Sequence, residues 1–147
     1  MCNLTTNITK TKVTGYKVVA KHKETNEYHS VAFGFQYKQP THTFSGLRKK
    51  QKVIAHFASN LLQFPKPQMK SRTAAFIRLK DARNLQRACI HSHDSRAWNS
   101  RKYRKVRDFY VIVVVKVKLQ GNLAKGSFAD SDVYAGRTIT ILKEMPF

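Results

Sequence analysis

The pattern of apolar and polar positions predicts two strands near the start of the chain. Residues 12–21 and 27–37 are rich in β-branched and aromatic side chains, and the polar run Glu24-Thr25-Asn26 separates them. This arrangement predicts an antiparallel hairpin. In the second segment, a period of two places the larger side chains together on one face: His29, Val31, Phe33, Phe35 and Tyr37.

The middle of the chain combines a further strand with helical spacing. A strand is predicted over 73–78 and a helix over 80–90, where Asp81 near the helix start suits the helix dipole. The apolar stripe of this helix is expected to comprise Ala82, Leu85, Ala88 and Cys89. Residues 53–62 also fit helical spacing, although their β-branched start keeps a strand possible.

The strongest strand pattern covers residues 109–119. Phe109, Val111 and the later odd positions are apolar, and so are Tyr110, Ile112 and Val114, so the strand belongs at the centre of a sheet. Residues 133–142 predict a final strand or pair of strands after a turn at Asp130 and Asp132. Together the segments predict one α+β domain over 1–147, with a mainly antiparallel sheet, one or two helices and a long basic loop.

Charge adds a class of partner to this fold. The chain has 28 Lys and Arg against 8 Asp and Glu, a net charge of +20. A small domain needs a net charge of only about 2 to 8 for solubility, so the excess favours an anionic partner over a merely soluble basic protein. Residues 45–107 hold seventeen basic residues against Asp81 and Asp94, which is +15 of the total. A concentrated excess is typical of a surface that contacts phosphates and releases counterions.

We therefore predict that this basic segment, 45–107, binds nucleic acid. The predicted phosphate contacts come from two basic clusters and from the helix between them: Arg48, Lys49, Lys50, Lys52, Arg83, Arg87, Arg96, Arg101, Lys102, Arg104, Lys105 and Arg107. Trp98 and Tyr103 lie among the cations of the second cluster, where each has a ring suited to stacking on an unpaired base. The alternative, that both rings are core anchors holding the loop, stays open.

Enzymatic and metal chemistry have little support. The carboxylates are few and scattered, and no Walker loop, nucleophile elbow or GxGxxG is present, so we expect neither an enzyme nor a cofactor. Cys89, His91, His93 and Asp94 are potential metal donors, but their spacing matches no zinc pattern, and we expect no metal.

Cellular location follows from the cysteines and the apolar runs. Cys2 and Cys89 suggest no disulfide framework, which favours a reducing compartment. The start of the chain lacks the features of a signal peptide, and the longest apolar run, Phe109 to Val115, is too short to span a bilayer. A cytoplasmic protein without a membrane partner is expected.

Several segments resemble small uncharacterised bacteriophage proteins. The resemblance lies in Gly15-Tyr-Lys-Val-Val-Ala20, Gly34-Phe-Gln-Tyr37, Phe76-Ile-Arg-Leu-Lys-Asp-Ala-Arg83, Val113-Val-Val-Lys-Val-Lys118 and Val133-Tyr-Ala-Gly-Arg-Thr-Ile-Thr-Ile-Leu142. It implies a phage protein acting in the host cytoplasm on nucleic acid, a nucleoprotein complex or an acidic host protein surface. Anti-CRISPR or other counter-defence inhibition is the implied role.

Two other functions stay open. The order of strands and helix also resembles ADP-ribosyltransferases, which use a catalytic Glu beside the last strands. Here Ala135-Gly136-Arg137 occupies the region where that Glu is wanted, and Glu144 comes late. The third alternative is a protein that sequesters an anionic nucleotide signal, which predicts a confined positive cavity in place of an extended surface.

Overall fold

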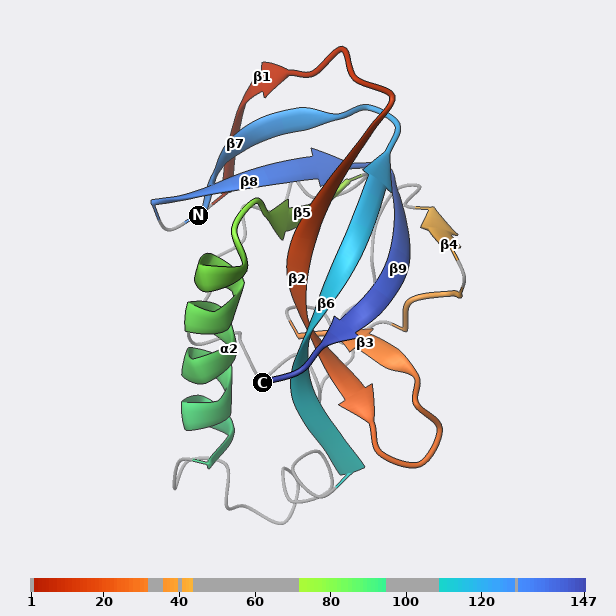
Figure 1. Ribbon diagram of the computed structural model, residues 1–147, viewed down its shortest axis with the longest axis vertical. Helices are drawn as coiled ribbons and strands as arrows, with labels where there is room; N and C mark the ends of the chain where they lie inside the picture. The colour runs from red at the N-terminus through yellow and green to blue at the C-terminus, as the bar shows by residue number, and fades with distance from the viewer. Residues whose placement is uncertain (1, 32–35, 40, 44–71, 95–108, 129) are drawn as a thin grey trace.

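In the part of the chain that the structure describes, one helix packs on a large antiparallel sheet (Figure 1). The computed structural model describes residues 2–31, 36–39, 41–43, 72–94, 109–128 and 130–147, and every structural statement below refers to these. They form ten elements, numbered as in Figure 1: β1 (Cys2–Asn7), β2 (Lys12–His22), β3 (Tyr28–Ser30), β4 (Thr41–Thr43), β5 (Thr73–Phe76), α2 (Leu79–Asp94), β6 (Tyr110–Gln120), β7 (Ala124–Phe128), β8 (Ser131–Gly136) and β9 (Thr138–Met145). The predicted α+β class with a mainly antiparallel sheet is confirmed; the basic loop and the helix expected over 53–62 lie outside the described residues.

The sheet has the strand order β1-β7-β8-β5-β2-β6-β9-β4, with β3 added beside β2. Strands β7 and β8 run across the upper part of Figure 1, whereas β2, β6 and β9 lie steeply inclined to them, with β6 pointing up and its two neighbours pointing down. The two parts join where Tyr16 of β2 pairs with Phe76 of β5. Gly15 permits this crossing, because a Cβ there would lie 2.8 Å from the carbonyl oxygen of Phe76.

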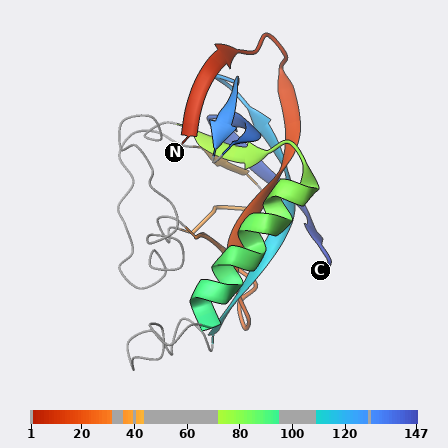
Figure 2. The same ribbon diagram turned by 90° about the vertical axis from the view of Figure 1, so that its left-hand side faces the viewer.

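Strand β6 is buried on both faces from Ile112 to Val115, where its sequence is apolar at every position. Its even positions Ile112 and Val114 pack with Ala82 and Cys89 of α2 in one apolar cluster. Its odd positions belong to a second cluster on the other side of the sheet: Val113, Val115, Val117 and Leu119. The helix therefore covers only the side of the sheet to which the even positions of β6 point, as the turned view in Figure 2 shows.

The predicted hairpin forms, but its second strand is shorter than expected. Strand β3 ends at Ser30, and Gln36 bridges back to His29 while the Tyr37 N–H donates to the Tyr28 carbonyl at 2.9 Å. The continuous strand predicted over 27–37 is therefore wrong. The return of the chain buries Tyr37, which is 2% exposed, in the second apolar cluster.

The helix differs from its predicted stripe at one position. Ala88 is exposed, and Gln86 is buried in its place. The spacing explains this, because Gln86 lies four residues from Ala82 on the same side of the helix and Ala88 lies six away. The buried amide of Gln86 donates to the Ile112 carbonyl at 3.1 Å and accepts from Arg83 at 2.9 Å, so its burial leaves no polar atom unsatisfied.

The other predicted strands form with shifted limits. The pair expected over 133–142 is present as β8 and β9; Asp130 lies at the turn with φ 65°, whereas Asp132 lies within β8. Phe109 and Val111 are 42% and 41% exposed, so the apolar stripe of β6 is buried only from Ile112 onward. No pattern in the sequence predicted β1, β4 and β7, which become strands by pairing with β7, β9 and β8, respectively.

Candidate nucleic-acid interface

Most of the predicted nucleic-acid contacts lie outside the described residues. These are Arg48, Lys49, Lys50, Lys52, Arg96, Trp98, Arg101, Lys102, Tyr103, Arg104, Lys105 and Arg107. The structure places the two others, Arg83 and Arg87, on α2. Arg87 is exposed, and its Nη1 donates to Asn84 Oδ1 at 3.2 Å. Its role as a phosphate contact stays a prediction.

Arg83 has contacts within the protein. Its Nη1 donates to the Gln86 side chain, and its Nη2 donates to the carbonyl oxygens of Met145, the last residue of β9, and of Pro146. The guanidinium also lies over the Phe147 ring, 5.4 Å from the ring centroid. Arg83 thus holds the C-terminal residues against α2.

The described residues contain a basic surface that the sequence predictions did not include. Beyond Val114, the even positions of β6 continue as Lys116 and Lys118. These side chains point to the same side of the sheet as Val114 because side chains along a strand alternate between its faces. Helix α2 covers Ile112 and Val114. By contrast, Lys116 and Lys118 are only half-buried. A period of two continued through residue 118 would have placed Lys116 and Lys118 on this side of the sheet from the sequence.

Neighbouring strands extend this surface into three rows across the sheet. The first row pairs Lys12, Gln120, Thr138 and Thr43 in order across β2, β6, β9 and β4. The second row pairs Thr14, Lys118, Thr140 and Thr41 in the same order. The third row pairs Lys116 with Lys143. We call these ten residues the lysine–threonine face; all of them are exposed or half-buried.

The charged residues of the lysine–threonine face are all positive. Four of its residues are lysines and none is acidic. Lys116 and Lys143 are directly opposite each other on neighbouring strands, an arrangement in which like charges destabilise a sheet. A bound anion would remove that repulsion. The face is therefore suited to binding phosphate groups.

Threonine hydroxyls supply neutral donors beside the lysines. The Oγ1 atoms of Thr41 and Thr140 are 3.0 Å apart, and those of Thr43 and Thr138 are 3.2 Å apart. In each pair one hydroxyl donates to the other, so the accepting hydroxyl keeps its own proton for a ligand oxygen. Hydroxyls of this kind commonly contact the phosphates and sugars of nucleic acids.

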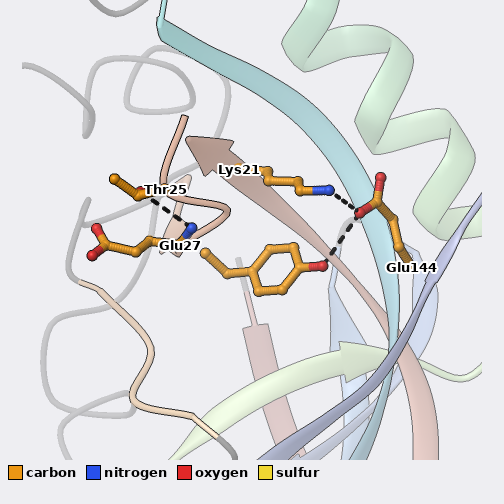
Figure 3. Close-up of polar contacts among 5 residues, drawn as sticks. Lys21, Thr25, Glu27 and Glu144 are labelled. Carbon is orange, nitrogen blue, oxygen red and sulfur yellow. Dashed lines mark hydrogen bonds and ion pairs between the residues drawn. The ribbon is translucent and has the colours of Figure 1, made fainter. Parts of the chain in front are cut away.

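The acidic residue of β9, Glu144, lies on the other side of the sheet. Its Oε2 accepts from Lys21 Nζ at 2.8 Å and from the Tyr28 hydroxyl at 3.2 Å (Figure 3). The bond to Glu144 raises the pKa of Lys21 above its usual value of 10.5, and burial raises the pKa of Tyr28. Glu144 is thus partnered by a cation and a phenol, and the transferase interpretation built on it stays a prediction.

The potential metal donors are only partly described. Cys89 is fully buried in the apolar cluster under α2, and burial raises the pKa of its thiol to about 12. The thiol is therefore protonated at neutral pH and poorly suited to metal binding or nucleophilic attack. His91 is exposed. Within the described ranges, no group of three or more His, Cys, Asp or Glu residues is placed to hold a metal ion.

Comparisons with known proteins leave the site to be interpreted from its own geometry. No protein-family model, no curated protein and no solved structure matches the chain. No helix in the part of the chain that the structure describes is long and apolar enough to cross a membrane.

Proposed function

We propose that this protein binds nucleic acid through its phosphates, with the lysine–threonine face as one part of the binding surface and the basic segment 45–107 as another. The observation that carries the proposal is the array of four lysines on a face whose ten residues include no acidic one, with Lys116 and Lys143 opposite each other on two strands. A sheet tolerates such repulsion at a cost in stability. Binding of a polyanion offsets this cost in stability, because each lysine that contacts a phosphate releases a counterion.

The rows of this face suit an extended polyanion better than a small anion. Lys116 and Lys118 lie two residues apart on one strand, about 7 Å along it. Lys12 and Lys143 lie on the strands to either side, β2 and β9. Charges distributed over three strands contact several phosphates of a chain at once, whereas a single nucleotide reaches only some of them.

The proposed biological role is inhibition of host defence by a phage protein. Such a protein binds to the nucleic acid, or to the phosphate-lined surface, of a defence nucleoprotein. It thereby competes with the partner that normally binds there. The charge array supports the binding part of this role. The counter-defence part rests on the resemblance of the sequence segments to phage proteins.

A salt titration of the full chain tests the proposed function. Affinity for a fluorescent oligonucleotide of about 15 nucleotides is measured at increasing salt, with polyglutamate as the polyanion for comparison. Four lysine–phosphate contacts on a single strand predict that log affinity falls with log salt with a slope of about −3 or steeper. Undetectable binding at low salt would contradict the proposal, and equal affinity for polyglutamate would assign the surface to an acidic protein.

A further inference from the structure

The C-terminal residue is the most exposed large apolar side chain in the described part of the protein. Phe147 is 77% exposed, compared with 47% for Leu142 and 42% for Phe109. Its position is nevertheless fixed, because the Arg83 guanidinium lies over its ring and donates to the carbonyl oxygens of the two preceding residues. Arg83 covers one side of the ring, and the exposure shows that much of the remainder faces solvent.

Phe147 lies on the same side of the sheet as the lysine–threonine face. Lys143 pairs with Lys116 and Met145 pairs with Val114, so the end of the chain runs along β6 toward the part of the sheet that α2 covers. Arg83 belongs to α2, which packs on this side. Phe147 lies four positions after Lys143, so their Cα atoms are no more than about 14 Å apart.

An exposed ring on the same side of the sheet as the face lysines favours single-stranded nucleic acid over a duplex. In a duplex the faces of the bases are stacked on one another, and a side chain at the surface meets only phosphates, sugars and base edges. In a single strand a base can turn onto an aromatic ring while the neighbouring phosphates meet cations. The Arg83 guanidinium on the other side of the ring adds a positive charge close to the stacked base.

We propose that the nucleic acid bound by this protein is single-stranded, and that the Phe147 ring, supported by Arg83, stacks on a base while lysines of the lysine–threonine face contact the adjoining phosphates. This inference rests on the proposed function, since it specifies the ligand of the same surface. It assigns to Arg83 a positioning role that differs from the direct phosphate contact predicted from the sequence.

The test compares Phe147→Ala with the matched variant Phe109→Ala in the full chain. Phe109 is also an exposed aromatic residue, but its ring stacks on His22 and lies before the start of β6, seven residues from Lys116. Affinities are measured for a single strand and for a blunt duplex of the same length. We expect tighter binding of the single strand, a loss on the order of tenfold in its affinity for Phe147→Ala, and recovery in Phe147→Trp. Phe109→Ala and duplex binding are expected to change less than twofold.

Two results would overturn the inference without affecting the proposed function. One is equal affinity of the unmodified protein for the single strand and the duplex. The other is an unchanged affinity of Phe147→Ala for the single strand, under conditions where replacing the face lysines weakens binding. Failure to bind both the single strand and the duplex at low salt would instead contradict the proposed function itself.

Discussion

Replacing Lys12, Lys116, Lys118 and Lys143 together with Gln is expected to lower the affinity for single-stranded nucleic acid between a hundredfold and a thousandfold at about 0.1 M salt. Each lost lysine–phosphate contact makes the slope of log affinity against log salt shallower by about 0.7. The loss of four contacts makes the slope shallower by about 2.8. The measurement is fluorescence anisotropy with a labelled oligonucleotide. The variant should be folded at least as stably as the unmodified protein, because it loses the repulsion between Lys116 and Lys143.

A pair of variants with the same change in charge is the control for this prediction. Lys116→Gln/Lys118→Gln removes two positive charges from the lysine–threonine face, and Lys23→Gln/Lys125→Gln removes two exposed charges from elsewhere. The first variant is expected to lose affinity roughly twenty- to thirtyfold, and the second less than threefold. Equal losses would mean that net charge alone, without this face, determines binding.

Leu119→Ala is expected to lower the free energy of unfolding by about 2 to 5 kcal/mol. Leu119 is fully buried, and it lies on the opposite side of β6 from its neighbour Lys118. Its Cβ would be 3.0 Å from a Cβ added at Gly136 at the end of β8, so Leu119 packs where the two parts of the sheet meet. Truncation leaves a cavity at this junction. Urea denaturation measures the loss as a lower midpoint with an unchanged slope.

Leu142→Ala is the matched control. It removes the same atoms from a side chain that is 47% exposed, at the position where the pairing of β9 with β6 shifts register. Its effect on the free energy of unfolding is expected to stay within about 0.5 kcal/mol. A similar loss in the two variants would show that the second apolar cluster does not hold the two parts of the sheet together.

The fold class was predictable wherever an element carried its own periodicity. Strand β2 is rich in β-branched residues, β6 begins with a continuous apolar run, and α2 shows one apolar stripe, so all three were found within a few residues of their limits. Strands β1 and β7 lack such a signal. Cys-Asn-Leu-Thr-Thr-Asn and Ala-Lys-Gly-Ser-Phe become strands because they pair with each other and because β7 pairs with β8. Tertiary context decides such segments.

The candidate site was less predictable, because it is assembled by register. The charge count along the chain pointed to residues 45–107. By contrast, Lys12, Lys116 and Lys143 are far apart in the sequence and form no cluster of charge there. The pairing of β2, β6 and β9 brings them to one face. The basic clusters of segment 45–107 remain predictions, since they lie outside the described residues.

Arg83 has contacts within the fold that its local sequence did not predict. The sequence predicted a phosphate contact on the exposed side of the helix, but the end of the chain returns to α2 and places two carbonyl oxygens and a ring against the guanidinium. A contact between residues more than sixty positions apart leaves no trace in local sequence pattern.

The central claim, that the lysine–threonine face holds the nucleic acid, is tested most directly by protection of individual lysines from acetylation, measured by mass spectrometry with and without a saturating single-stranded oligonucleotide. The account predicts that Lys12, Lys116, Lys118 and Lys143 become protected, whereas exposed Lys23 and Lys125 react equally in both samples. Unchanged reactivity of the four face lysines in a sample that binds the oligonucleotide would contradict it.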